Sequence, residues 1–167
     1  LEAATRNGVI VTTTGAANAA AVAEYTFALL LGLLRHVPAA DAGMRTGAWH
    51  RPPLIGMELE GKVFGIIGIG AIGRRVARQA MGFGMRVIAN DPFIDGSPGA
   101  SIEMAPLSRL LQEADIVSLH VRLGPSTKNL IDASAFASMK TTAALVNTSR
   151  GQAVDELERK EWPTACG

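Results

Sequence analysis

The stretch that decides the fold runs from Lys62 to Asp91 and reads KVFGIIGIGAIGRRVARQAMGFGMRVIAND. Its first residues, KVFGIIG, form a continuous apolar run, which is typical of a strand buried on both faces of a parallel sheet. The residues AIGRRVARQAMGFG follow as an expected helix, and its closing glycines can act as C-caps. A second apolar strand, MRVIAN, ends where Asp91 and Pro92 interrupt it. This order of strand, helix and strand predicts one unit of a parallel α/β sheet.

A glycine-rich motif joins the first strand to the helix: the pattern G-x-G-x-x-G reads Gly68-Ile69-Gly70-Ala71-Ile72-Gly73. In a dinucleotide-binding turn the first glycine permits a tight turn and the second leaves room for a pyrophosphate. The third lets the helix pack closely on the strand. The helix N-terminus adds free N–H groups and a partial positive charge that favour phosphates. A purely structural glycine turn is the alternative interpretation.

An acidic residue ends the second strand at the distance that a dinucleotide site requires. Asp91 lies 18 positions beyond Gly73, and the usual spacing is roughly 20. Its carboxylate can accept hydrogen bonds from both hydroxyls of the adenosine ribose, and it would repel a 2′-phosphate. The motif and the acid together predict an NAD site rather than an NADP site.

The same alternation of strands and helices continues on both sides of this unit. Downstream, ASIEMA, DIVSLHV and AALVN are expected strands, and LSRLLQEA and DASAFASM are expected helices. Upstream, residues 8–14 (GVIVTTT) predict a short strand, and residues 38–60 predict an irregular stretch because Pro52-Pro53 and several glycines lie there. The pattern predicts an α/β fold, a Rossmann-type doubly wound parallel sheet.

A long apolar helix is expected between these upstream segments, over AAAVAEYTFALLLGLLRHV (19–37), with Asn18 as a possible cap. Apolar residues cover most of its circumference, so both sides should be buried. One side could contact its own domain and the other a partner subunit, as in a dimerisation helix. A fully internal helix is the alternative.

Bulk properties exclude several classes of partner. The 167 residues are 48% hydrophobic and 19% charged, with a formal net charge of +1, so we expect a globular domain with neither a nucleic-acid nor a membrane partner. The longest apolar run, Tyr25 to Leu34, is shorter than the ~20 residues that span a bilayer. Cys166 is the single cysteine, which is compatible with the reducing cytoplasm. No cluster of His, Cys, Asp or Glu has metal-ligand spacing.

Four segments also resemble a known family. ELEGKVFGIIGIGAIGRRVARQAMGFGMRVIANDP resembles the NAD domain of D-2-hydroxyacid dehydrogenases. LEAATRNGVIVTTTGAANAAAVAEYTFALLLGLLRH, LLQEADIVSLHVRLGPSTKNLID and MKTTAALVNTSRGQAVDE continue the resemblance in the same order, from residue 1 to about 157. The phosphoglycerate dehydrogenase branch is the most similar, and glyoxylate or hydroxypyruvate reductases stay open. The resemblance implies hydride transfer between the C2 atom of a small 2-hydroxy acid and the nicotinamide of NAD.

The resemblance also assigns a catalytic role to Arg150. The substrate-gripping arginine of the family lies in an N-x-[AS]-R-G turn, which here is Asn147-Thr148-Ser149-Arg150-Gly151. A guanidinium is always charged and can hold a carboxylate by two parallel hydrogen bonds. The alternative is a surface arginine that pairs with Asp155 or Glu156.

Further cofactor contacts follow from the resemblance alone. Ala71 and Ile72 contact NAD through the glycine loop, and Thr148 and Ser149 line the nicotinamide side. Val121 and Thr127 lie near the adenosine. The family usually reads H-x-P-L where this chain reads His120-Val121-Arg122-Leu123. A missing proline should loosen that loop, because its ring would have restricted the backbone.

None of the three histidines fits the catalytic base. His36 ends the long helix, and His50 has no orienting acid nearby. His120 leaves a strand on the ligand side, but it occupies a loop position of the family. The family's catalytic histidine follows later, in a P-H sequence after an acid in an E-P segment, and neither appears here.

We therefore expect a fragment of an NAD-dependent oxidoreductase. Residues 1–15 would end a substrate-domain segment, residues 16–157 would form the NAD-binding domain, and residues 158–167 would be an aberrant tail. The chain alone should turn over poorly, and it should form a homodimer through the long helix. The alternatives are a non-catalytic NAD-binding regulatory module and a purely structural α/β protein.

Overall fold

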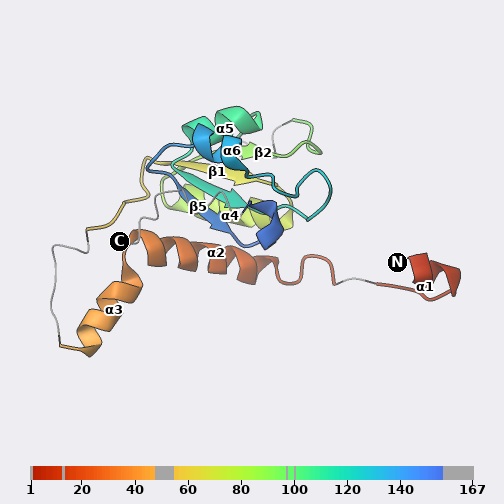
Figure 1. Ribbon diagram of the computed structural model, residues 1–167, viewed down its shortest axis with the longest axis horizontal. Coiled ribbons are helices and arrows are strands. Elements are labelled where there is room, and N and C mark those ends of the chain that lie inside the picture. The colour runs from red at the N-terminus through yellow and green to blue at the C-terminus, as the bar shows by residue number, and fades with distance from the viewer. Residues whose placement is uncertain (1, 13, 48–54, 97, 100, 156–167) are drawn as a thin grey trace.

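The computed structural model describes residues 2–12, 14–47, 55–96, 98–99 and 101–155. A five-stranded parallel sheet lies at its centre, in the order β3-β2-β1-β4-β5 (Figure 1). Its strands are β1 (Val63–Ile67), β2 (Arg86–Asn90), β3 (Ile102–Met104), β4 (Ile116–Leu119) and β5 (Ala144–Asn147). The predicted doubly wound α/β sheet is confirmed, and each strand expected between residues 62 and 147 is present.

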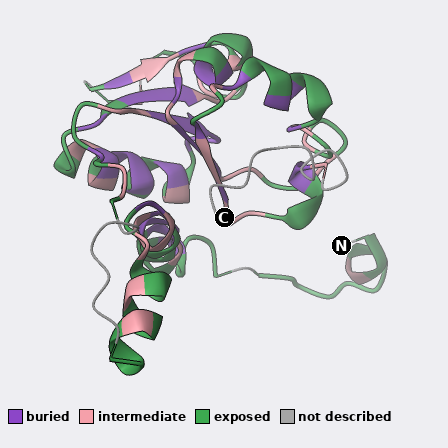
Figure 2. Ribbon diagram, turned by 60° about the vertical axis from the view of Figure 1, so that its left-hand side comes forward, coloured by how far each residue is buried: buried purple, intermediate pink, exposed green. Residues whose placement is uncertain are grey.

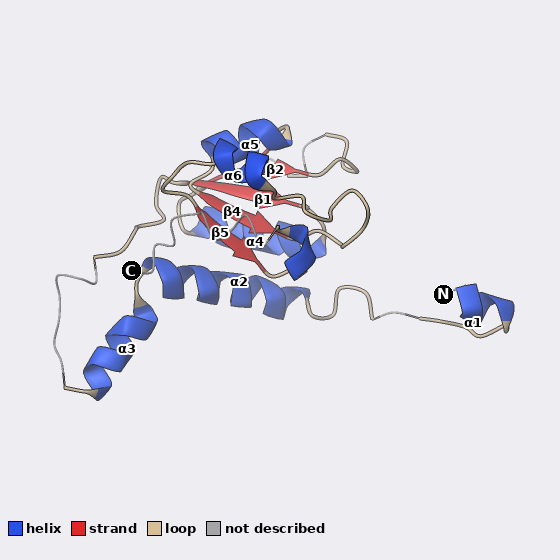
Figure 3. Cartoon of the chain, viewed as in Figure 1, coloured by secondary structure: helices blue, strands red, loops and turns tan. Residues whose placement is uncertain are grey.

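Helices cover both faces of the sheet (Figure 3). On one face lie α4 (Ala71–Gly82) and α2 (Ala19–Leu34), which packs on α4 and β5. On the other face lie α5 (Leu107–Glu113) and α6 (Ala133–Ser138). β1 is central and pairs with β2 and β4, so Gly65 lies between Ile88 and Val117. β1, β2 and β4 are nearly continuous apolar runs and are buried on both faces, whereas the edge strands β3 and β5 are only partly buried (Figure 2).

α2 is buried along one side only. The residues of that side recur at helical spacing: Ala19, Ala23, Phe27, Leu30 and Leu34. Phe27 stacks on Phe64 and Phe83, with ring centroids 5.7 and 5.2 Å apart. The other side exposes Tyr25 and Leu29, which are 60% and 42% accessible. The fully internal alternative is therefore wrong for the described part of the chain, which leaves an apolar face of α2 uncovered.

The end of α2 differs from the prediction. The helix stops at Leu34, and His36 adopts a left-handed conformation (φ 53°, ψ 34°). A second helix, α3 (Val37–Arg45), follows where an irregular stretch was expected. Pro38 favours this helix because a proline in the first turn loses no hydrogen bond, and Arg45 donates to Asp41 one turn earlier. No described helix is alone long and apolar enough to cross a membrane; α2 and α3 pass that test only together, across a 66° bend.

Two further expectations at the N-terminal side are wrong. Residues 8–12 and 14 form no strand, and Val9, Ile10 and Val11 are exposed. Their β-branched composition favours a strand, but no described strand lies beside them to accept their hydrogen bonds. A short helix, α1 (Glu2–Arg6), precedes them and buries no residue.

Asn18 does precede α2, but its side chain makes no capping hydrogen bond. The expected tail, 158–167, and His50 lie outside the described residues.

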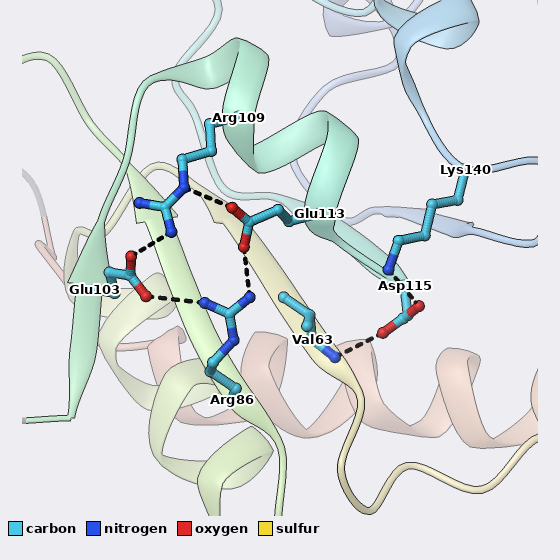
Figure 4. A network of polar contacts seen from close by, with 7 residues as sticks. All are labelled: Val63, Arg86, Glu103, Arg109, Glu113, Asp115 and Lys140. Carbon is cyan, nitrogen blue, oxygen red and sulfur yellow. Dashed lines mark hydrogen bonds and ion pairs between the residues drawn. The ribbon is translucent and has the colours of Figure 1, made fainter.

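Ion pairs join α5 to the sheet on the face away from α2. Arg86 and Arg109 each bind both Glu103 and Glu113, and together the four side chains link β2, β3 and α5 (Figure 4). The hydrogen bonds with Arg86 and Arg109 lower the pKa of Glu113. The two arginines are exposed and the two glutamates are partly exposed, so solvent screens these pairs and they contribute little to stability.

Asp115 connects three strands at their N-terminal ends. Its carboxylate accepts hydrogen bonds from the N–H of Val63 and from Lys140 Nζ, both at 2.8 Å (Figure 4). Its backbone N–H donates to Val63 O, and its carbonyl accepts from the N–H of Ala144. Burial opposes ionisation of Asp115, but the bonds from Lys140 and Val63 outweigh it and lower the pKa below 3.8.

Replacing Asp115 with Asn should lower the free energy of unfolding at pH 7 by roughly 1–2 kcal/mol, since the charge facing Lys140 is lost. The lowered pKa means that the ionised carboxylate stabilises the fold above pH 3.8, and that this contribution disappears as the pH falls through the folded-state pKa. Urea denaturation at pH 7, 5 and 3 should show the difference between wild type and variant shrinking with acid. Asp41→Asn, at an exposed ion pair, is the control and should change little. An equal effect of the two substitutions would contradict the role of Asp115.

Candidate functional site

The turns that follow β1, β4 and β5 surround one cleft of about 750 Å³. β1 and β4 are neighbours at the point where the strand order reverses, which is where ligands bind in open α/β sheets. The residues that line the cleft are Gly15, Ala16, Asn18, Ala19, Val22, Gly70, Ala71, Ile72, His120, Val121, Arg122, Leu123, Thr148, Ser149 and Arg150. Seven of the predicted site residues therefore lie together: Gly70, Ala71, Ile72, Val121, Thr148, Ser149 and Arg150.

Two glycines of the motif are required by the fold itself. Gly68 has φ +93°, and a Cβ atom there would lie 2.6 Å from His120 O. A Cβ atom at Gly73 would lie 2.2 Å from Gly68 O. Both positions therefore need glycine so that β1, α4 and the end of β4 can approach one another, and neither residue lines the cleft.

Gly70 differs, because no contact among the described residues requires a glycine there. Its backbone is extended (φ −74°, ψ −156°), and an added Cβ would meet no atom within 4 Å. It nevertheless lines the cleft at the N-terminus of α4. A bare backbone beside free N–H groups fits the close approach of a pyrophosphate. The described residues therefore fit NAD on geometric grounds.

Asp91 lies beside the glycine loop, outside the cleft lining. Its Oδ2 accepts from the N–H of Ile69 and its Oδ1 from the N–H of Phe93, both at 3.0 Å. These bonds fix the carboxylate against the loop that the motif forms. Each carboxylate oxygen keeps a further lone pair, so Asp91 can still accept from ribose hydroxyls.

The turn that carries Arg150 is organised by Asn147, the last residue of β5. Its Oδ1 accepts from the N–H and the hydroxyl of Ser149 at 2.9 and 2.8 Å, and its Nδ2 donates to Arg150 O at 2.9 Å. This is the local bonding that asparagine brings to turns. Arg150 is exposed at the cleft, and Nη1 donates to Ser149 O. Within the described residues no ion pair joins Arg150 to Asp155, and Glu156 lies outside them.

Thr127 has a local structural role. Its hydroxyl donates to Arg122 O at 2.6 Å and accepts from the N–H of Gly124 at 2.8 Å. These bonds close the loop after β4, in which Arg122 stands where the family usually has proline. The hydrogen bonds of Thr127 thus restrict the backbone that the proline ring would have restricted. Thr127 does not line the cleft, and its predicted contact with the adenosine stays a prediction.

The sequence reasoning missed several residues of the cleft. Arg122 lines it, and with Arg150 it gives the cleft two guanidinium groups without an acidic side chain among the lining residues, which suits an anion. The departure from H-x-P-L was the only signal for Arg122. Asn18 and Val22 had no local signal, because the packing of α2 brings them there. No group of three His, Cys, Asp or Glu in the described part of the chain could hold a metal ion.

His120 lines the cleft but is mostly buried. Burial lowers its pKa from 6.5 to about 4, so the ring is neutral at pH 7. Its Nε2 lies 2.9 Å from Ser118 Oγ and its Nδ1 lies 3.5 Å from Thr148 Oγ1. Both ring nitrogens are therefore engaged by the protein rather than directed at a substrate.

Replacing Gly70 with Val should weaken NADH binding by about tenfold or more, which corresponds to about 1.4 kcal/mol, because the side chain would occupy the approach of the pyrophosphate. Thermal stability should hardly change, since no atom lies within 4 Å of the added Cβ. NADH fluorescence titration and thermal unfolding of this chain measure the two effects.

Gly73→Ala is the matched variant, and it should destabilise the fold by roughly 1–3 kcal/mol or more through overpacking against Gly68 O. If Gly70→Val binds NADH as wild type does, the cleft is not the pyrophosphate site.

The chain is similar to several known dehydrogenases and reductases. The chain is 42% identical over 158 residues to D-3-phosphoglycerate dehydrogenase from Sus scrofa, covering 93% of this chain and 30% of that protein. It is 42% identical over 159 residues to glyoxylate reductase from Korarchaeum cryptofilum, covering 92% and 48%. The crystal structure of D-lactate dehydrogenase from Aquifex aeolicus, complexed with NAD and lactic acid, superposes with a TM-score of 0.86 at 30% identity, covering 95% and 48%. The chain thus spans less than half the length of each.

The match to a protein family covers most of the sequence. Residues 27–158 match the family described as D-isomer specific 2-hydroxyacid dehydrogenase, NAD binding domain. This range includes the glycine loop, Asp91, the turn after β4 and the turn of Arg150. The chain therefore belongs to the D-isomer specific 2-hydroxyacid dehydrogenases and carries their NAD-binding domain.

Proposed function

We propose that this chain is the cofactor-binding part of an NAD-dependent dehydrogenase that acts on the CH–OH group of a 2-hydroxy acid. One observation carries the proposal: a single cleft brings the bare backbone of Gly70 together with the guanidinium of Arg150. A nucleotide and an organic acid could thus be held side by side. NAD, when bound, supplies the nicotinamide that exchanges hydride with C2 of the acid.

Each part of the cleft has a task in this proposal. The N–H groups at the start of α4 bind the pyrophosphate, and Asp91 binds the adenosine ribose. Thr148 and Ser149 line the nicotinamide side. Arg150 holds the carboxylate of the substrate, and its orientation follows from the bonds that Asn147 makes within the turn. His120 is neutral and bonded within the protein, so a proton-exchanging base would come from outside the described residues.

The substrate class follows from the charge of the cleft and from the relatives. The described lining residues include two arginines and no acidic side chain, which favours a small anion. The names of the relatives, D-3-phosphoglycerate dehydrogenase and glyoxylate reductase, favour a 3-phosphoglycerate or a hydroxypyruvate/glyoxylate type of substrate. A non-catalytic NAD-binding regulatory module is the second candidate, since it too would keep the glycine loop and Asp91 but would not need Arg150.

We also propose a cytoplasmic homodimer without nucleic-acid or membrane partners. The uncovered face of α2, with Tyr25 and Leu29 exposed, supports a contact between two copies of this helix around a twofold axis. The near-zero net charge supports the proposed lack of nucleic-acid and membrane partners, and the single cysteine supports the cytoplasmic location. The domain boundaries proposed are 1–15, 16–157 and 158–167.

Replacing Arg150 with Ala should lower kcat/KM for the 2-hydroxy acid at least about 10²-fold, because the carboxylate loses its bidentate partner. The assay requires a polypeptide that carries this domain together with a substrate domain. NADH affinity should stay within about twofold, since Arg150 is assigned to the acid and not to the nucleotide. Arg150→Lys keeps the positive charge but lacks the two parallel N–H donors of a guanidinium. Its kcat/KM should therefore lie between those of wild type and Arg150→Ala. Unchanged turnover in Arg150→Ala would favour the regulatory module.

Placing charges on the uncovered face of α2 should dissociate the homodimer. Tyr25→Lys combined with Leu29→Lys should weaken association by about 2 kcal/mol or more, measured by sedimentation velocity at micromolar concentration. Phe93→Lys is the matched control, because Phe93 is also exposed and apolar but lies after β2. A monomeric wild-type protein at these concentrations would contradict the proposed dimer.

A further inference from the structure

A row of side-chain hydrogen bonds runs behind the cleft from β4 to α2. Ser118 Oγ lies 2.9 Å from His120 Nε2, and His120 Nδ1 lies 3.5 Å from Thr148 Oγ1. Thr148 Oγ1 lies 3.1 Å from Thr26 Oγ1, and Thr26 Oγ1 donates to Val22 O at 2.8 Å. Ser118 and Thr26 have no exposed surface. The row therefore joins three elements through groups that water does not reach at either end.

The proton of Thr26 sets the direction of the whole row. A hydroxyl has one proton to donate, and that of Thr26 goes to Val22 O. Thr26 Oγ1 must then accept from Thr148, which uses the only hydroxyl proton of Thr148. His120 Nδ1 must therefore carry a hydrogen and donate to Thr148 Oγ1. In a neutral ring Nε2 is then an acceptor, and it accepts from the hydroxyl of Ser118.

The surroundings of the ring agree with this arrangement. Burial disfavours the imidazolium and lowers the pKa of His120 to about 4. Among the described residues that line the cleft with it, the charged ones are Arg122 and Arg150, so that lining offers no carboxylate to stabilise an imidazolium. A doubly protonated ring would turn the bond with Ser118 around, with Nε2–H as the donor and Ser118 Oγ as the acceptor. The buried hydroxyl proton of Ser118 would then lose the acceptor that the neutral ring provides.

We propose that His120 is a positioning residue whose Nδ1–H holds Thr148, and through Thr148 the turn that presents Arg150. Asn147 shapes that turn from within by its bonds to Ser149 and Arg150, and the row fixes it from behind to α2 and β4. Thr148 lines the cleft, so its orientation sets the wall against which a nicotinamide would lie. The catalytic consequence rests on the proposed function, whereas the protonation pattern does not.

The first test uses this chain unaltered. Two-dimensional ¹H–¹⁵N NMR of the histidine rings at pH 7 should show His120 neutral, with the hydrogen on Nδ1 and a bare Nε2, the less common tautomer of free histidine. In Thr148→Val the acceptor is lost, and the tautomer should move toward Nε2–H. A wild-type ring with Nε2–H, or a charged ring at pH 7, would overturn the proposal whether or not the chain is part of a dehydrogenase.

The second test separates the two ring nitrogens by kinetics. In His120→Asn the amide nitrogen lies near the place of Nδ1 and can donate to Thr148. In His120→Gln the amide reaches the place of Nε2 instead. With the substrate domain present, His120→Gln should lower kcat by about 10- to 10²-fold with NADH affinity little changed, and His120→Asn should recover most of the loss. Equal loss in both variants would overturn the positioning role.

The two hypotheses can fail separately. If Arg150→Ala retains full turnover while the NMR shows the Nδ1–H tautomer, the proposed dehydrogenase function is wrong and the hydrogen-bond row stands. If Arg150→Ala loses turnover while His120→Gln keeps wild-type kcat, the function stands and the positioning role of His120 is wrong.

Discussion

The close contact between the end of β1 and the first turn of α4 is the constraint on which the rest of the site depends. The carbonyl of Gly68 occupies the place where a side chain at Gly73 would begin. Because no side chain intervenes, the helix starts directly above the strand, and its N–H groups point over the carboxyl edge of the sheet. The same turn packs against His120 O at the end of β4. One steric condition thereby aligns the N-terminal end of α4 with one wall of the cleft.

The two edges of the sheet use polar groups in different ways. At the N-terminal ends of the strands, Asp115 satisfies backbone and side-chain donors, and nearby exposed ion pairs add little. At the carboxyl ends, asparagine, threonine and histidine bond to one another and to the backbone, which leaves Arg122 and Arg150 as the charged groups of the cleft lining. Carboxylates are thus paired with basic groups at the N-terminal edge, whereas the described cleft lining carries positive charge without carboxylates.

Periodicity and glycine spacing were sufficient to predict the central fold from the sequence. The buried strands between residues 62 and 147 and the tight turn and close packing at Gly68 and Gly73 are local properties, and they were predicted correctly. Residues 8–14 were mispredicted because β-branched side chains form a strand only beside another strand. Residues 38–45 were mispredicted as part of an irregular stretch that was inferred from Pro52-Pro53 and several glycines, whereas Pro38 lies in the first turn of α3, where proline is favoured. Asn18 and Val22 could not be found at the cleft, because only the packing of α2 on α4 and β5 brings them there.

The bond between Thr26 and Thr148 also bears on the order in which the molecule folds. These residues are 122 positions apart, so their contact closes a very long loop, and its entropic cost is met only after the strands between them have assembled. The glycine turn depends on contacts within one strand–helix unit, whereas the cleft wall that contains Thr148 depends on a contact across most of the chain. A ligand that spans both would bind only the fully assembled chain, and its binding would stabilise that state by mass action.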